Sequence, residues 1–267
     1  MCRLKFLLFF LMFGILLNES CKNSLKDDLS LTPEEYQKLG MPDHKKIWIL
    51  DDCKSATVTL SSLKIANSLL LPRKQSKKSG AIFSRLVNEE ILDFVNDTTL
   101  SLYARASLIQ QFAHYPNELY KLYYDSSKEK QYYNVELIDI DIFILSVNKQ
   151  KLILAFKIMN SKDEADISLQ YGLKSVKYNY LKTIERLLKE QLRSQVFSVK
   201  DLNRLSTEVS LTLQENHKWF LPADKITIGS EIQTVIDKSP SGYIKRNYIK
   251  ALKALNDSTE MQNDILK

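Results

Sequence analysis

The sequence predicts a mostly α-helical fold, a multi-helix bundle of roughly eight to ten helices. Two observations support this prediction. The 267 residues contain only six glycines and six prolines, too few for the many turns of a β-sandwich. Apolar residues also recur at helical spacing along most of the chain, between polar segments that suit helix caps and loops.

In the first half of the chain, capping residues and helix breakers indicate where helices begin and end. Thr32, with Glu35 three residues later, forms a capping box that begins a short helix, and this helix ends at Gly40. The basic run 73–80 is expected to be a solvent-exposed loop. The other helices expected in this half cover residues 55–71, 83–96, 99–115 and 117–124.

Residues 134–159 fit two different structures. Isoleucine and aspartate alternate from Ile138 to Ile142, which is the period of a β-strand, and a small β-hairpin over 134–159 is one interpretation. A helical hairpin fits the same residues, and the helices expected on both sides favour it. Only a strand would place Asp139 and Asp141 on one face, as a pair of catalytic carboxylates requires.

The second half has the clearest helical periodicity. Apolar residues from Leu173 to Leu188 form a stripe along a helix of about 20 residues. Ser198 is expected to cap the next helix, whose inner face runs from Leu202 to Leu213. Two more helices are expected over 228–238 and 241–255, and the tail 257–267 is expected to be disordered.

The first 20 residues have the pattern of an export signal. Arg3 and Lys5 form a basic flank, and an uncharged apolar run follows from Phe6 to Leu17. This run is too short to span a bilayer, which takes roughly 20 apolar residues. We therefore expect residues 1–20 to be a signal peptide.

The residues around Cys21 resemble a bacterial lipoprotein signal, of the relaxed type found in Bacteroidetes. Ser20 matches the small residue before the cysteine, and Leu17 lies one residue further back than is usual. Asn18 and Glu19 depart from the usual leucine and small residue. The resemblance implies that the chain is cut before Cys21 and that a diacylglycerol, with acyl chains such as palmitate, is joined to its thiol.

This resemblance also implies an address. Lys26, Asp27 and Asp28 are similar to the acidic signal that is implicated in sending such lipoproteins to the cell surface; the alternative is a solvated tether. The expected location is the bacterial outer membrane, facing the periplasm or the cell exterior, with the membrane bound through the lipid. Residues 21–31 are then a flexible tether, and 32–256 a single helical domain.

No motif for catalysis, metal binding or nucleotide binding is found along the chain. His44, His114 and His217 lie far apart in the sequence, so neither a metal nor a cofactor is expected. The net charge of +6 is mild and spread over the chain, which argues against a nucleic-acid partner. Cys53 is expected to be a small buried hydrophobe.

The last helix is one candidate for binding a protein partner or an anionic membrane. Its basic residues lie opposite an apolar face, and the alternative is a helix that docks this face on the core. The basic residues are Lys245, Arg246, Lys250 and Lys253.

A cluster of tyrosines is the second candidate for partner binding. Tyrosine suits the recognition of proteins or sugars, because the ring offers area and the hydroxyl a hydrogen bond; the alternative is the rim of the core. The candidates are Tyr120, Tyr123, Tyr124, Tyr132 and Tyr133.

We therefore expect a lipid-anchored envelope protein with a non-catalytic binding or scaffold role, a class that includes inhibitors and immunity proteins. The alternative is a hydrolase of an envelope polymer or glycan, using acids such as Asp139 and Asp141 brought together by the fold. A pocket holding two carboxylates roughly 5–10 Å apart would favour the enzyme. A convex bundle with exposed tyrosines would favour the binding protein.

Overall fold

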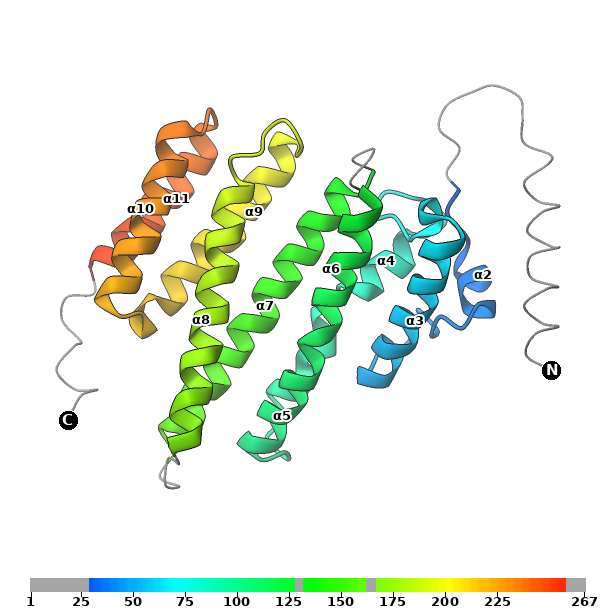
Figure 1. Cartoon of the computed structure of the whole chain (residues 1–267), viewed down its shortest axis with the longest axis horizontal. Helices are drawn as coiled ribbons and strands as arrows, with labels where there is room; N and C mark the ends of the chain where they lie inside the picture. Colours follow the sequence, from blue (N-terminus) through cyan, green and yellow to red (C-terminus); the bar gives the residue numbers. More distant parts are fainter. Residues whose placement is uncertain (1–28, 128–131, 162–166, 258–267) are drawn as a thin grey trace.

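The computed structural model describes residues 29–127, 132–161 and 167–257, and all regular secondary structure in these residues is helical. The predicted multi-helix bundle is therefore confirmed. The helices lie side by side in a row, from α2 and α3 at one end to α10 and α11 at the other, with α7 and α8 in the middle (Figure 1). None of the described helices has the length and apolar character needed to cross a membrane.

Helices and short 3₁₀ segments alternate with brief connections along the chain. The α-helices are α2 (Pro33–Lys38), α3 (Leu50–Ala66), α4 (Gly80–Leu86), α5 (Leu102–Phe112), α6 (His114–Ser127), α7 (Asn134–Met159), α8 (Ile167–Glu190), α9 (Val199–Asn216), α10 (Pro222–Lys238) and α11 (Gly242–Asn256). The 3₁₀ segments are η1 (Ser68–Leu70), η2 (Glu89–Val95) and η3 (His217–Trp219).

The expected helix starts that depend on a side-chain cap are confirmed. The Thr32 hydroxyl accepts a hydrogen bond from the Glu35 N–H at 3.3 Å, and the Glu35 carboxylate accepts one from the Thr32 N–H at 2.7 Å. Just after this helix the chain turns at Gly40, which has a φ of +103° that other residues rarely adopt. The Ser198 hydroxyl caps α9, as expected, by accepting a hydrogen bond from the Asp201 N–H, and the Ser241 hydroxyl caps α11 by accepting one from the Ile244 N–H.

Several expected helix boundaries in the chain are wrong. The helix expected over 83–96 is broken into α4 and η2, because the Asn88 side chain accepts a hydrogen bond from the Glu90 N–H and begins a new turn. Pro116 does not end a helix but lies in the first turn of α6. Pro222 likewise begins α10, six residues before the expected start. Proline has no backbone N–H, and it fits the first turn because N–H groups there have no partner within the helix.

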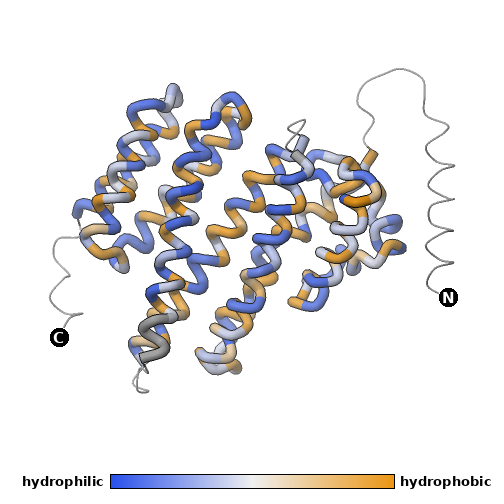
Figure 2. Tube along the Cα trace, in the orientation of Figure 1, coloured by the Kyte–Doolittle hydropathy of each residue, from blue (hydrophilic) through white to orange (hydrophobic). Residues whose placement is uncertain are grey.

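Residues 134–159 form neither a β-hairpin nor a helical hairpin but the single 26-residue helix α7. The helix is apolar on nearly all sides, because neighbouring helices cover it on both flanks. Ile138 faces one set of neighbours and Ile140 the other, so the alternation of isoleucine reflects burial on two sides. Figure 2 shows hydrophobic residues recurring along the whole length of α7, with hydrophilic ones between them.

The helix α7 belongs to two hydrophobic cores. The first core lies among α2–α7 and contains Phe143, Ile144 and Val147 of this helix. The second lies among α7–α11 and contains Leu145 and Leu152. Both halves of the bundle are therefore packed on opposite sides of one helix.

Buried tyrosines join the first core to the loops around it. The hydroxyl groups of Tyr36, Tyr123 and Tyr133 donate to backbone carbonyls in the segment 68–72, at 2.7, 2.8 and 2.6 Å. Tyr248 in the second core differs. Its side chain is fully buried, and within the described chain its hydroxyl has no hydrogen-bond partner.

This difference predicts opposite effects for two equivalent substitutions. Tyr123→Phe should lower the free energy of unfolding by about 1–2 kcal/mol, because the buried Pro72 carbonyl loses its donor. Tyr248→Phe should be neutral or stabilising, because it removes a desolvated hydroxyl that donates to no described group. Urea unfolding of the two variants measures this difference, and equal losses of stability would contradict it.

Candidate functional site

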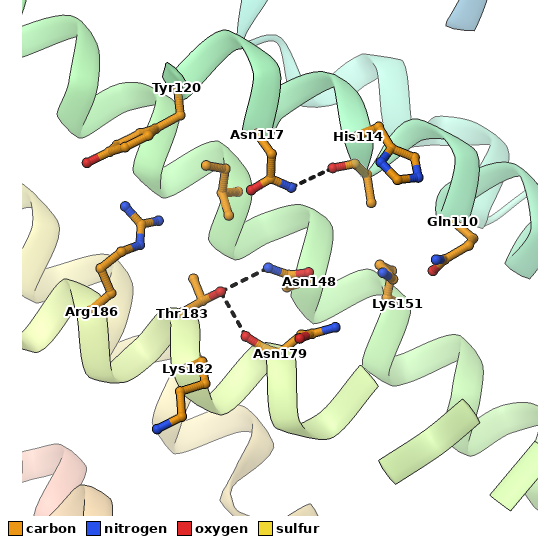
Figure 3. Close-up of a pocket in the computed structure, with 12 residues that line it drawn as sticks. Gln110, His114, Asn117, Tyr120, Asn148, Lys151, Asn179, Lys182, Thr183 and Arg186 are labelled. Carbon is orange, nitrogen blue, oxygen red and sulfur yellow. Dashed lines mark hydrogen bonds between the residues drawn. The ribbon is translucent and has the colours of Figure 1, made fainter. Parts of the chain in front are cut away.

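A groove of about 580 Å³ lies along the middle of the bundle, between α6, α7 and α8 (Figure 3). The helix α6 contributes Tyr120, α7 contributes Asn148 and Lys151, and α8 contributes Thr183 and Arg186. None of the described residues that line the groove is acidic. The groove is thus polar and positively charged.

The amide side chains of the groove are held in place by the protein. Asn148 Nδ2 donates to Thr183 Oγ1 at 3.0 Å, and Thr183 Oγ1 donates to the Asn179 carbonyl at 2.9 Å (Figure 3). On the opposite wall, Asn117 Nδ2 donates to the Ala113 carbonyl at 2.7 Å. These bonds use the NH₂ groups of Asn117 and Asn148, and their oxygens receive no hydrogen bond within the described chain. The two amide oxygens can therefore accept hydrogen bonds from a ligand.

Arg186 at one end of the groove is fixed by two partners. Its guanidinium forms an ion pair with Asp141, which is 1% exposed, and its Cζ lies 4.8 Å from the centre of the Tyr120 ring. The Tyr120 ring stacks on Tyr124 in turn, with 5.7 Å between ring centres. Arg186 is therefore part of the wall, and contacts within the protein hold its guanidinium in place.

Burial raises the pKa of the Asp141 carboxyl to about 7, against the opposing effect of the Arg186 charge. The folded protein therefore holds a proton that the unfolded chain loses between about pH 4 and pH 7. The free energy of unfolding should accordingly fall as the pH rises through this window.

The variant Asp141→Asn should show a smaller fall over the same range. Glu136, whose pKa burial also raises, contributes in the same direction and is present in both proteins, so the difference between the two profiles isolates Asp141. Urea unfolding at several pH values measures this, and parallel profiles would contradict it.

Lys151 is the unusual cation of the groove. The residue is 9% exposed, burial lowers the pKa of its ammonium, and it forms no ion pair within the described chain. Lys182 also lines the groove, but its side chain is 52% exposed and its ammonium lies 2.6 Å from the Glu185 carboxylate. Figure 3 shows the Lys182 side chain directed away from the other lining residues.

Asp139 and Asp141 do not form a pair of catalytic carboxylates. Two residues apart on a helix, they point in different directions and meet different cations. Asp139 pairs with Lys74 at 2.6 Å and with Arg204, well apart from Arg186, which binds Asp141. The strand that would have placed both acids on one face is absent from residues 134–159.

The basic run 73–80 is not simply a solvated loop. Besides the ion pair of Lys74 with Asp139, the Lys74 N–H donates to the Glu136 carboxylate at 2.7 Å, and Ser79 is fully buried. The loop is thus held against α7 by two buried acids. The sequence gives no local signal for this contact, because the partners are more than 60 residues apart.

The tyrosine cluster does not form one exposed surface. Tyr123 and Tyr133 are 0% and 1% exposed, which removes them as partner-binding residues. Tyr120 and Tyr132 are half-buried, and Tyr124 is 39% exposed. Only Tyr120 lines the groove.

The helix α11 is docked rather than free. Ile244, Tyr248, Ala251 and Leu255 are buried against α9 and α10, as expected for a terminal helix that packs its apolar face on the core. Arg246, Lys250 and Lys253 are exposed, and Lys245 is half-buried.

The remaining candidates divide into buried residues, dispersed residues and residues outside the described chain. Cys53 is fully buried, and burial raises the pKa of its thiol to about 12, so it is an unreactive core residue as expected. No group of three or more metal-binding side chains occurs in the described parts of the chain. Cys21, Lys26, Asp27 and Asp28 lie outside the described residues.

The fold and the groove together define a helical-bundle protein with a basic, amide-lined groove at its centre. No family model, curated protein or solved structure matches the chain.

Proposed function

We propose that this chain is a lipid-anchored protein of the bacterial envelope, with a non-catalytic binding role that is performed by the central groove. The address rests on the export pattern of residues 1–20 and the lipoprotein-like segment that ends in Cys21. The binding role rests on one observation, a polar groove with a buried lysine that forms no ion pair in the described chain.

The competing role, a hydrolase of an envelope polymer or glycan, has less support. Hydrolysis of a glycosidic bond uses two carboxyl groups that flank the substrate. The acids of α7 are engaged by Lys74, Arg204 and Arg186, and none of the described residues lining the groove is acidic. An inhibitor or immunity protein remains within the proposed class.

The address is tested by labelling with palmitate in a native-like bacterial host, followed by fractionation. Cys21→Ala should lose both the label and membrane retention, because the acyl chains provide the only anchor in the proposal. Cys53→Ala is the matched control, since its thiol is buried in the first core, and it should keep both. A wild-type protein that is secreted without label would overturn the lipid anchor.

The side of the membrane is tested separately by adding protease to intact cells. The proposed surface signal predicts that the wild-type protein is degraded, whereas replacing Asp27 and Asp28 with asparagine should protect it behind the outer membrane. Equal degradation of both proteins would make residues 26–28 a plain tether.

A further inference from the structure

We propose that the central groove binds a small hydroxylated organic anion, an acidic monosaccharide, with its acid group on Lys151. The proposal deepens the proposed function, since it names a ligand class for the groove, but it does not depend on the lipid anchor.

Lys151 provides the charge recognition. The Lys151 side chain is largely buried, so its ammonium is poorly hydrated and would be stabilised by an anion, and none of the described residues lining the groove supplies a carboxylate. Arg186 cannot serve in its place, because its guanidinium is already paired with Asp141 and lies over Tyr120. An acid group of a ligand in the groove would complete the pairing that Lys151 lacks.

The amides provide recognition of hydroxyl groups. The Oδ1 atoms of Asn117 on α6 and Asn148 on α7 accept no hydrogen bond from the described residues, while the NH₂ group of each amide donates to the protein (Figure 3). Gln110 adds a further amide to the lining. Two fixed amides in the same groove as Lys151 suit a ligand that carries hydroxyl groups beside its charge.

The volume fits a ligand of this size. Small-molecule sites are typically clefts of about 300–1,000 Å³, and the groove measures about 580 Å³. The groove thus holds a monosaccharide with room for ordered water. Its acid group can be a carboxylate or a phosphate, since an ammonium accepts either as a point charge.

The test uses the purified full-length protein in detergent, with four probes: glucuronate, glucose 6-phosphate, glucose and inorganic phosphate. Binding is measured by calorimetry and by the shift in the thermal midpoint, which should rise by about 5 °C at a probe concentration roughly a hundredfold above its Kd. At least one of the two acidic sugars should bind at least ten times more tightly than glucose and than inorganic phosphate. The comparison of glucuronate with glucose 6-phosphate identifies the acid group.

Two variants connect binding to Lys151. Lys151→Met should weaken binding at least tenfold, while its own thermal midpoint stays the same or rises, because an unpaired buried charge is removed. Lys157→Met is the matched control, since this lysine lies on the same helix as Lys151 but is exposed and does not line the groove, and its binding should match the wild type.

Several results would overturn the proposal. These are the absence of binding by both acidic sugars, equal binding of glucose or of inorganic phosphate, and unchanged affinity in Lys151→Met. Each of them leaves the palmitate labelling of Cys21 unaffected, so failure of the ligand class is distinguishable from failure of the proposed address.

Discussion

Replacing Phe143 with alanine is expected to lower the free energy of unfolding by about 3–5 kcal/mol. The side chain is 1% exposed and lies on the first-core side of α7. Its ring meets Phe112 and Tyr115 edge-on, with 6.0 and 6.5 Å between ring centres. The substitution removes these contacts and leaves a cavity that rigid helices fill only in part.

Phe143→Ala should lower the free energy of unfolding equally in both halves of the bundle, because α7 belongs to both cores. Two tryptophans report on them separately: Trp48 is buried in the first core, and Trp219 stacks on Phe156 beside the second, with 4.9 Å between ring centres. In single-tryptophan backgrounds, Trp48→Phe and Trp219→Phe, urea unfolding followed by fluorescence should show equal shifts on addition of Phe143→Ala.

Val58→Ala, at a side chain 68% exposed on α3, should leave both curves in place. A shift at Trp48 without a shift at Trp219 would mean that the halves unfold independently. The expected single domain over 32–256 would then have to be divided.

Replacing Asp139 with asparagine is expected to lower the free energy of unfolding by about 2–4 kcal/mol. The carboxylate is 9% exposed and bridges Lys74 of the basic loop to Arg204 of α9. Its neutralisation leaves two cations without their partner, although both can turn partly to water, since their side chains are 37% and 34% exposed.

The same substitution should loosen the basic loop. Limited trypsin digestion is expected to cut Asp139→Asn after Lys77 or Lys78 faster than the wild type, because the ion pair that holds the loop on α7 is lost. Asp51→Asn is the matched control, since its carboxylate is 82% exposed and pairs only with the exposed Lys54 among the described residues. An Asp139→Asn protein that behaves like this control would show that the bridge adds nothing to stability.

Much of the fold could be predicted because its signals are local. The capping box at Thr32 and the cap at Ser198 are confirmed, since a helix start depends on residues within one turn. The prolines at 116 and 222 were harder, because the same residue ends one helix or begins the next. Whether a proline ends one helix or begins the next depends on the packing of the flanking segments.

The central helix could not be predicted with the same rules. A helix with one buried face shows a 3.6-residue period, but α7 is covered on two sides, so its apolar residues follow no single period. In the sequence, Asp139 and Asp141 alternate with isoleucine and therefore resemble the polar face of a strand. In the folded chain they are buried, and each is matched by a cation from a distant segment.

The groove was also beyond sequence reasoning. Asn148 and Thr183 are 35 residues apart and meet only because α7 packs against α8. Lys151 looked like an ordinary surface lysine beside Lys149. Its burial depends on how three helices meet, and of the residues named from the sequence only Tyr120 and His114 lie in the groove.

The bridge at Asp139 has a consequence for how the protein folds. Lys74 precedes Asp139 by 65 residues and Arg204 follows it by the same distance, so the bridge closes two long loops of chain. Helical bundles built from neighbouring helices fold within microseconds to milliseconds, whereas contacts between distant residues slow the rate. The two ion pairs of Asp139 form only when both loops have closed, whereas the packing of α7 against α6 and α8, its neighbours in the sequence, needs neither loop. We therefore expect the bridge at Asp139 to form late in folding, a kinetic property that would suit the proposed export, because a chain must stay unfolded while it crosses a membrane.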